Sequence, residues 1–205
     1  MMNNTKLQPK LLGFAGHRQV ADKEKLAIVI RHEVEMMKQA LGEKMIGISS
    51  AAAGADLVFL RACVELRIPT IVILPFSEER FSEDFEDQAE WQLAQQLMSV
   101  SLVKYIIPGR YESPQAYHVV STQLLEWADA FLFAWNGQPQ KGIGGTGETV
   151  ADARDTGTPS RIIDTGSLVA RWQVPVDESR AAKHGFETRR ELLEFLDRRY
   201  SGAVH

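Results

Sequence analysis

Two glycine-containing turns, far apart in the chain, hold the residue types that bind phosphate groups. The first covers 13–18 (GFAGHR), at the end of an apolar run, and the second covers 142–149 (GIGGTGET), after another apolar run. Glycine lets a backbone approach a ligand closely, and a helix that starts after such a turn points N–H groups and its positive dipole end at an anion. We therefore expect a phosphate cradle at 144–149, with a flexible surface loop as the alternative.

Charged side chains in these turns suggest how the cradle would work. Arg18 is the predicted anion ligand, because a guanidinium stays charged and offers a planar fork of donors. His17 could contact phosphate as an imidazolium, and exposure to solvent is the alternative for both residues. Glu148 is the candidate general acid or base, and its alternative role is a favourable interaction with the helix dipole.

Apolar runs bounded by turn residues recur along the chain, and most are continuously apolar, as is typical of strands buried on both faces. The runs are 11–15, 45–49, 70–74, 102–107, 130–135 and 161–163. Helical patterns alternate with them, at 26–41, 56–66, 84–100, from Ser113 onward and at 149–155. This alternation predicts an α/β fold with a doubly wound, mostly parallel, Rossmann-like sheet.

In such a sheet the carboxyl ends of the parallel strands share one edge, so the loops that follow them meet there. We expect the two glycine turns to converge with the segment after the second strand, where Ser49 and Ser50 offer hydroxyls and Gly54 allows a tight turn. Asp56 could accept hydrogen bonds from ribose hydroxyls or cap the helix that follows. The sequence therefore predicts one nucleotide-sized site at this edge.

After residue 166 the alternation of strands and helices stops. We expect a Rossmann-like domain over 1–166 and a C-terminal extension over 167–205. Within the extension, Thr188 and Glu191 form a capping-box pattern that predicts one further helix, packed on the domain or on a partner.

Composition narrows the class of protein. The chain has 205 residues, 44% of them hydrophobic, and a net charge of −4, which favours one folded core and gives no electrostatic signal for nucleic acid or an anionic membrane. We therefore expect neither of these as a partner. Cys63 is the only cysteine, which excludes an intramolecular disulfide, and no signal-peptide or membrane-spanning pattern is present. The expected location is the cytoplasm.

Taken together, these segments resemble the SLOG superfamily, a Rossmann-like group that includes the Lonely Guy phosphoribohydrolases and the DNA-processing protein DprA. Residues 13–18 resemble its first glycine turn, 49–56 resemble the DprA-type second segment, and 144–149 resemble the Gly-Gly-x-Gly-Thr phosphate motif. The resemblance extends from about Leu11 to Asp164. It implies a nucleotide-binding site.

The chain departs from this motif at the catalytic position. In the phosphoribohydrolases the motif continues Thr-x-x-Glu, with the final Glu catalytic, whereas here Glu148 stands at the Thr position and Ala151 at the Glu position. Either Glu148 or Asp152 substitutes for that carboxylate, or the ligand is bound without being cleaved.

The sequence therefore predicts a protein that binds a nucleotide or nucleotide-derived ligand, with hydrolysis of its N-glycosidic bond left open. The alternative is a non-catalytic nucleotide sensor that acts through a protein partner. We expect a homodimer and no cofactor or metal. Glu148 is the catalytic candidate, and the predicted ligand-binding residues are Gly16, His17, Arg18, Ser49, Ser50, Gly54, Asp56, Gly144, Gly145, Thr146, Gly147 and Thr149.

Overall fold

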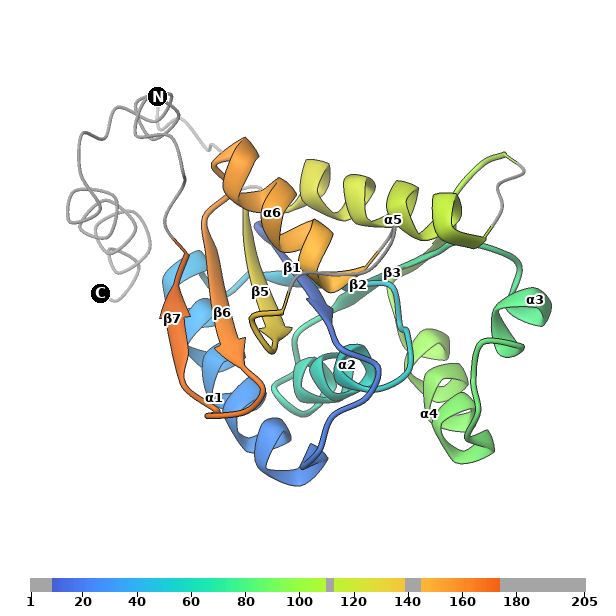
Figure 1. Ribbon diagram of the computed structural model, residues 1–205, viewed down its shortest axis with the longest axis horizontal. Helices are drawn as coiled ribbons and strands as arrows, with labels where there is room; N and C mark the ends of the chain where they lie inside the picture. The colour runs from blue at the N-terminus through green and yellow to red at the C-terminus, as the bar shows by residue number, and fades with distance from the viewer. Residues whose placement is uncertain (1–8, 110–112, 139–144, 174–205) are drawn as a thin grey trace, which may run out of the picture.

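A seven-stranded sheet with helices on both faces organises the computed structural model, which describes residues 9–109, 113–138 and 145–173 (Figure 1). The strands are β1 (Leu11–Gly16), β2 (Ile46–Ser49), β3 (Thr70–Leu74), β4 (Val103–Ile106), β5 (Ala130–Trp135), β6 (Ser160–Asp164) and β7 (Ala170–Trp172). Their spatial order is β4-β3-β2-β1-β5-β6-β7, and every neighbouring pair is parallel except β6 and β7. The predicted doubly wound, mostly parallel α/β fold is confirmed.

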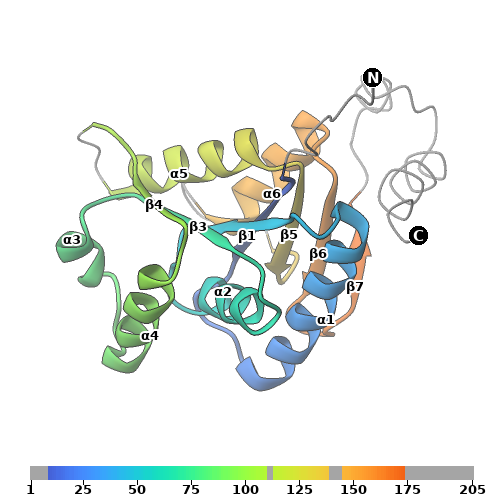
Figure 2. The same cartoon turned by 180° about the vertical axis from the view of Figure 1, so that it is seen from behind.

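The helices form two layers, one on each face of the sheet (Figures 1 and 2). One layer holds α1 (Lys23–Leu41), α2 (Ala55–Glu65) and α4 (Gln88–Ser99), and the other holds α5 (Ser113–Trp127) and α6 (Thr146–Thr156). A short helix, α3 (Glu78–Ser82), follows β3. Parallel neighbours need such crossovers, because a short hairpin joins only antiparallel strands.

The apolar core has one part on each face of the sheet. On the α1 and α2 side, the rings of Phe14 and Phe59 stack with centroids 4.5 Å apart. On the α5 and α6 side, Phe131 and Phe133 of β5 stack at 4.4 Å. Five of the six β5 residues are buried, as expected for a central strand with helices on both faces.

Strand β4 differs from the prediction that it is buried on both faces. Val103 and Ile106 are exposed, because β4 lies at the edge of the sheet and has a neighbour, β3, on one side only. A hydrophobic pattern reports the apolar character of a strand and not the number of its neighbours. Lys104, between these apolar residues, is a typical edge-strand residue.

Several helix boundaries also differ from the prediction. The helix expected over 84–100 begins only at Gln88, after Asp87 caps it by accepting a hydrogen bond from the Ala89 N–H at 2.8 Å. Helix α3 and strand β7 were not predicted. Helix α6 begins at Thr146, three residues before the predicted start, and this shift changes the interpretation of the glycine cradle.

Strand β7 pairs with β6, so the sheet continues past residue 166, the predicted end of the Rossmann-like domain. The helix predicted from Thr188 lies outside the described residues. Within the described part of the chain, no helix is both long enough and apolar enough to span a membrane.

Candidate functional site

A pocket of about 470 Å³ opens at the carboxyl edge of the sheet, where β1 and β5 are neighbours. This is the point where the strand order reverses, since the chain proceeds outward from β1 through β2 to β4 on one side and from β5 to β7 on the other. Open α/β sheets bind ligands in the crevice at such a point. The lining residues are Ala15, Gly16, His17, Arg18, Gln19, Ser50, Ala52, Asp56, Tyr117, Val120, Ser121, Leu124, Asn136, Gly145, Thr146, Thr149 and Thr165.

The turn after β1 is fixed against the start of α2. The Ala55 N–H donates to the carbonyl of His17 at 3.1 Å, which ties the two backbones together. At Gly54, φ is +84°, and a Cβ there would lie 2.1 Å from the carbonyl oxygen of Arg18. Only glycine allows this approach, so Gly54 acts by supporting the turn that carries Arg18.

The buried side chain of Asp56 connects the carboxyl end of β1 to the carboxyl end of β2. Its carboxylate accepts hydrogen bonds from the Gly16 N–H at 3.1 Å, the Ser49 hydroxyl at 2.9 Å and the Ser50 hydroxyl at 2.7 Å. Burial raises the pKa of Asp56, and these hydrogen bonds act in the opposite direction. Gly54, and not Asp56, occupies the cap position of α2, so the carboxylate braces the turn instead of capping the helix.

His17 joins the turn after β1 to the loop after β5. Its Nε2 atom accepts a hydrogen bond from the backbone N–H of Asn136 at 3.2 Å. This bond connects the two loops at the carboxyl edge of the sheet. His17 also lines the pocket.

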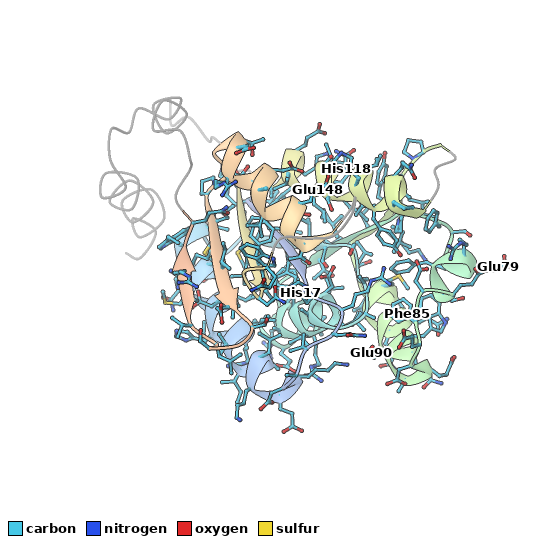
Figure 3. All side chains as sticks on the ribbon, in the orientation of Figure 1. His17, Glu79, Phe85, Glu90, His118 and Glu148 are labelled. Carbon is cyan, nitrogen blue, oxygen red and sulfur yellow. The ribbon has the colours of Figure 1, made fainter. Side chains whose placement is uncertain are left out.

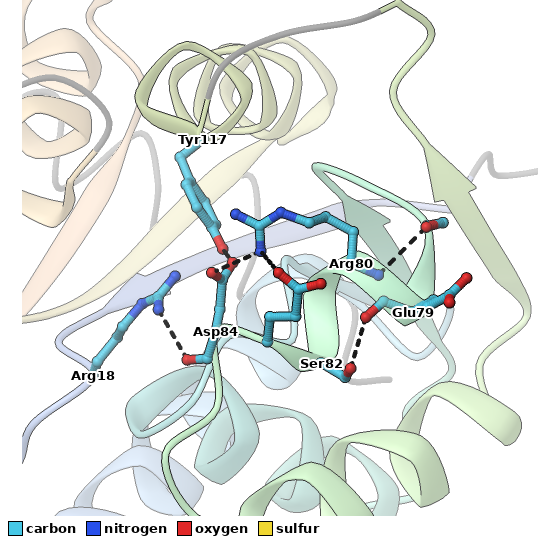
Figure 4. A network of polar contacts seen from close by, with 8 residues as sticks. Arg18, Glu79, Arg80, Ser82, Asp84 and Tyr117 are labelled. Carbon is cyan, nitrogen blue, oxygen red and sulfur yellow. Dashed lines mark hydrogen bonds and ion pairs between the residues drawn. The ribbon is translucent and has the colours of Figure 1, made fainter.

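Arg18 is exposed at the mouth of the pocket and contacts two other segments (Figure 4). Its Nη1 donates to the backbone carbonyl of Asp84 at 3.3 Å, and its guanidinium carbon lies 5.0 Å from the ring centre of Tyr117. The position of this cation is thus restricted by contacts with the α3–α4 segment and with α5.

The second glycine turn provides the opposite wall, at the start of α6. Gly145 is the cap residue and makes no side-chain capping bond, and its carbonyl accepts from the N–H groups of Glu148 at 3.0 Å and Thr149 at 3.1 Å. Gly145, Thr146 and Thr149 line the pocket. The positive end of the α6 dipole is therefore directed at the same space as Arg18.

Glu148 does not line this pocket. It lies on the first turn of α6 beside α5, where its Oε1 atom is 3.4 Å from Nδ1 of His118 (Figure 3). One turn later, partial burial and the negative charge of Glu148 raise the pKa of Asp152. The carboxylates of Glu148 and Asp152 therefore face the contact between α5 and α6. They do not face the space between Arg18 and the N-terminus of α6.

The structure brings most of the predicted binding residues to one place. Gly16, His17, Arg18, Ser50, Asp56, Gly145, Thr146 and Thr149 line the pocket, Ser49 and Gly54 support it from behind, and Gly147 is not in the lining. Gly144 lies outside the described residues.

Tyr117 and Asn136 line the pocket but were not among the predicted binding residues. Asn136 follows β5 at the predicted edge of the sheet, so its position was a signal that could have found it. Tyr117 lies within α5, and only the packing of that helix brings it to the pocket. In the described part of the chain, no group of three or more His, Cys, Asp or Glu residues could hold a metal ion.

Solved structures of DNA processing protein A share this fold. The chain matches that protein from Helicobacter pylori with a TM-score of 0.52 and 14% identity, covering 94% of this chain and 82% of the other; the work on that structure describes its single-stranded DNA binding mode. It matches the Streptococcus pneumoniae protein with a TM-score of 0.51 and 13% identity, covering 91% of this chain and 61% of the other. No protein-family model and no curated protein sequence matches the chain.

The comparison contradicts the prediction that the ligand is a small nucleotide and that nucleic acid is not a partner. A protein of the same fold binds single-stranded DNA. The exclusion was based on the net charge of −4, which sums the whole surface, whereas a single strand needs only a local cleft with cationic and stacking groups. The nucleotide hydrolase and the nucleotide sensor both assumed a small nucleotide ligand, so neither function is proposed for this chain. The homodimer stays a prediction that a single chain does not test.

Proposed function

We propose that the chain binds single-stranded DNA at the pocket between the β1 turn and α6. The observation that carries this proposal is the convergence of an exposed arginine, a helix N-terminus and an aromatic ring on one pocket of about 470 Å³. The fold shared with DNA processing protein A supports it. Membership of the SLOG superfamily and a cytoplasmic location are part of this proposal.

A phosphate group of the strand would lie between Arg18 and the start of α6. The Arg18 guanidinium supplies a permanent charge and a fork of donors, and the backbone at Gly145 and Thr146 supplies the positive end of a helix dipole. The cap residue Gly145 makes no side-chain hydrogen bond, so a phosphate would add to the compensation that Glu148, in the first turn, already gives the N-terminus of α6.

A nucleoside of the strand would occupy the remaining space. Binding pockets for ligands of this size are about 300–1,000 Å³, and apolar walls with a few polar groups are typical. Val120 and Leu124 of α5 supply apolar surface, while Ser50 and Asn136 supply polar groups. Tyr117 is partly exposed and the Arg18 guanidinium lies over its ring, so the pair offers a stacking surface of the kind that binds bases without sequence preference.

The charge of the protein limits how many phosphates it would hold. With a net charge of −4 and one exposed arginine in the pocket, we expect one or two phosphate contacts. Each phosphate contact on a single strand contributes about −0.7 to the slope of log K against log salt concentration. Binding should therefore depend weakly on salt, with a slope between about −0.7 and −1.4.

The test is fluorescence anisotropy with a labelled 20-nucleotide single strand, the same sequence as a duplex, and a mononucleotide as competitor. We expect the single strand to bind more tightly than the duplex or the mononucleotide. Arg18→Ala should weaken binding by about tenfold or more, since hydrogen bonds to charged groups contribute roughly 1.5–3 kcal/mol. Arg31→Ala, which removes an exposed arginine of α1 that does not line the pocket, is the matched control and should bind normally.

Three results would contradict the proposal. They are absence of binding to the single strand, competition by the mononucleotide at the same concentration as the oligonucleotide, and an equal loss of affinity in Arg18→Ala and Arg31→Ala.

A further inference from the structure

Arg18 belongs to a network of side chains that extends beyond the pocket (Figure 4). Asp84, in the segment between α3 and α4, contacts Arg18 through its backbone carbonyl and Tyr117 through its carboxylate, which accepts the phenol hydrogen. Tyr117 in turn places its ring 5.0 Å from the Arg18 guanidinium. The three residues therefore form a closed set of contacts.

The phenol hydrogen bond determines where the ring lies. Burial and the Asp84 carboxylate raise the pKa of Tyr117, so its hydroxyl stays protonated and remains a donor at neutral pH. Phe76 packs edge-on against the same ring, with centroids 6.1 Å apart. The ring thus has two fixed neighbours besides Arg18.

Arg80 offsets part of the negative charge of Asp84, and its Nη1 atom also lies 3.3 Å from Oε2 of Glu83. Its Nη1 atom lies 3.3 Å from Oδ1 of Asp84, and its guanidinium carbon lies 5.0 Å from the centre of the Phe76 ring. Without Arg80, the Asp84 carboxylate would offset part of the positive charge of Arg18. With Arg80 in place, the Asp84 carboxylate offsets less of that charge and still accepts the phenol hydrogen of Tyr117.

We infer that Asp84 and Tyr117 are positioning residues, which hold the Arg18 guanidinium in the orientation that receives a phosphate of the strand. The inference rests on the proposed function. An exposed arginine has many rotamers, and fixing one of them costs entropy when a ligand binds. The Tyr117 ring and the Asp84 carbonyl restrict those rotamers before the ligand arrives.

The test is a double-mutant cycle on single-stranded DNA binding with Tyr117→Phe and Arg18→Ala. Tyr117→Phe keeps the ring and removes the hydroxyl that bonds to Asp84. It should weaken binding roughly three- to tenfold when Arg18 is present, the range of one hydrogen bond, and have no measurable effect in the Arg18→Ala background. Asp84→Asn should follow the same pattern with a smaller loss, because an amide oxygen still accepts the phenol hydrogen.

Tyr105→Phe on β4, outside the pocket lining, is the control and should change binding in neither background. An equal loss from Tyr117→Phe with and without Arg18 would overturn the inference, because the Tyr117 hydroxyl would then act independently of the arginine. No loss in either background would overturn it too.

A second measurement separates this inference from the proposed function. The Nε–H group of Arg18 should give a resolved NMR signal in the wild-type chain without DNA, and Tyr117→Phe should move that signal to the position of a free arginine. If the wild-type chain fails to bind DNA, the proposed function is wrong, while this signal still decides whether Tyr117 positions Arg18. An unchanged signal in Tyr117→Phe would refute the positioning role.

Discussion

The two walls of the pocket are built in different ways. The turn after β1 is held by residues remote in sequence: the α2 N-terminus through Gly54 and Asp56, the α3–α4 segment through Asp84, and α5 through Tyr117. The wall at the start of α6 is held by its own first turn, where Gly145 accepts from two backbone N–H groups of the same helix. One wall depends on tertiary structure and the other on local structure.

The walls also differ in what they offer a ligand. The β1 wall presents side chains, foremost Arg18, whereas the α6 wall presents backbone groups at a helix end. Side-chain substitutions should therefore impair the first wall more than the second, and substitutions outside the pocket lining should matter only for the first.

The largest effect is expected from Gly54→Ala. The new Cβ would lie 2.1 Å from the Arg18 carbonyl oxygen at a φ of +84°, so the turn must move. We expect at least about tenfold weaker DNA binding and a loss of about 1–3 kcal/mol in the free energy of unfolding. Anisotropy and urea denaturation measure the two quantities.

Gly42→Ala is the matched control for that substitution. Gly42 also has a positive φ, +99°, but a Cβ there meets nothing within 4 Å. The control should lose stability and keep its affinity for DNA. If both variants lose affinity to the same extent, the close contact between Gly54 and Arg18 is not what supports the pocket.

A pH-dependent loss of stability is expected from Asp56→Asn. The amide cannot accept from all three donors, so the variant should be less stable by about 1–3 kcal/mol. Burial raises the pKa of Asp56 in the folded state. The contribution of Asp56 to the free energy of unfolding of the wild-type chain therefore falls as pH rises above 3.8, its pKa in the unfolded state. The gap between variant and wild type should therefore narrow as pH rises, which urea denaturation from pH 3 to pH 7 would detect. A gap that widens with pH contradicts the assignment.

A minor effect is expected on the α6 wall from Gly145→Ala. The backbone at Gly145 has a φ of −118° and a ψ of 172°, an extended conformation that any residue adopts. Binding should stay within about threefold of wild type, because the ligand would contact backbone groups that the substitution keeps. A loss as large as that of Gly54→Ala would remove the distinction between the two walls.

The smallest effect on binding is expected from Glu148→Gln. Glu148 lies outside the pocket lining, beside His118, so its removal should leave the affinity for DNA unchanged within error. The loss of a negative charge from the first turn of α6 should cost about 0.3–1 kcal/mol of stability. Thermal unfolding and anisotropy together test this expectation. A large change in affinity would show that Glu148 contributes to DNA binding.

The sequence predicted the parts of the molecule that follow from local pattern. The apolar run of β5 identified a strand buried on both faces, and the glycine turns marked the edge at which the pocket lies. Strand β4 has a similar apolar pattern and was misinterpreted, because the order of strands is set by packing between elements. The start of α6, three residues earlier than predicted, placed Glu148 on a helical turn that faces α5.

The contacts around Arg18 could not be predicted from the sequence either, because they too depend on packing between elements. Asp84 and Tyr117 are 33 residues apart, and neither follows a strand end at the predicted site. Their hydrogen bond exists only because the α3–α4 segment and α5 pack around the turn after β1. Net charge misled the choice of ligand, since it averages over surfaces that the ligand does not touch.

The most direct test of a DNA site between the two walls is a set of backbone amide NMR spectra recorded while a single-stranded oligonucleotide is added. The account predicts the largest shifts at 16–18 and 145–149, on both sides of the pocket, and their loss in Arg18→Ala. Shifts confined to another surface, such as the groove between α2 and α4 that Leu57 and Leu93 line, would contradict it.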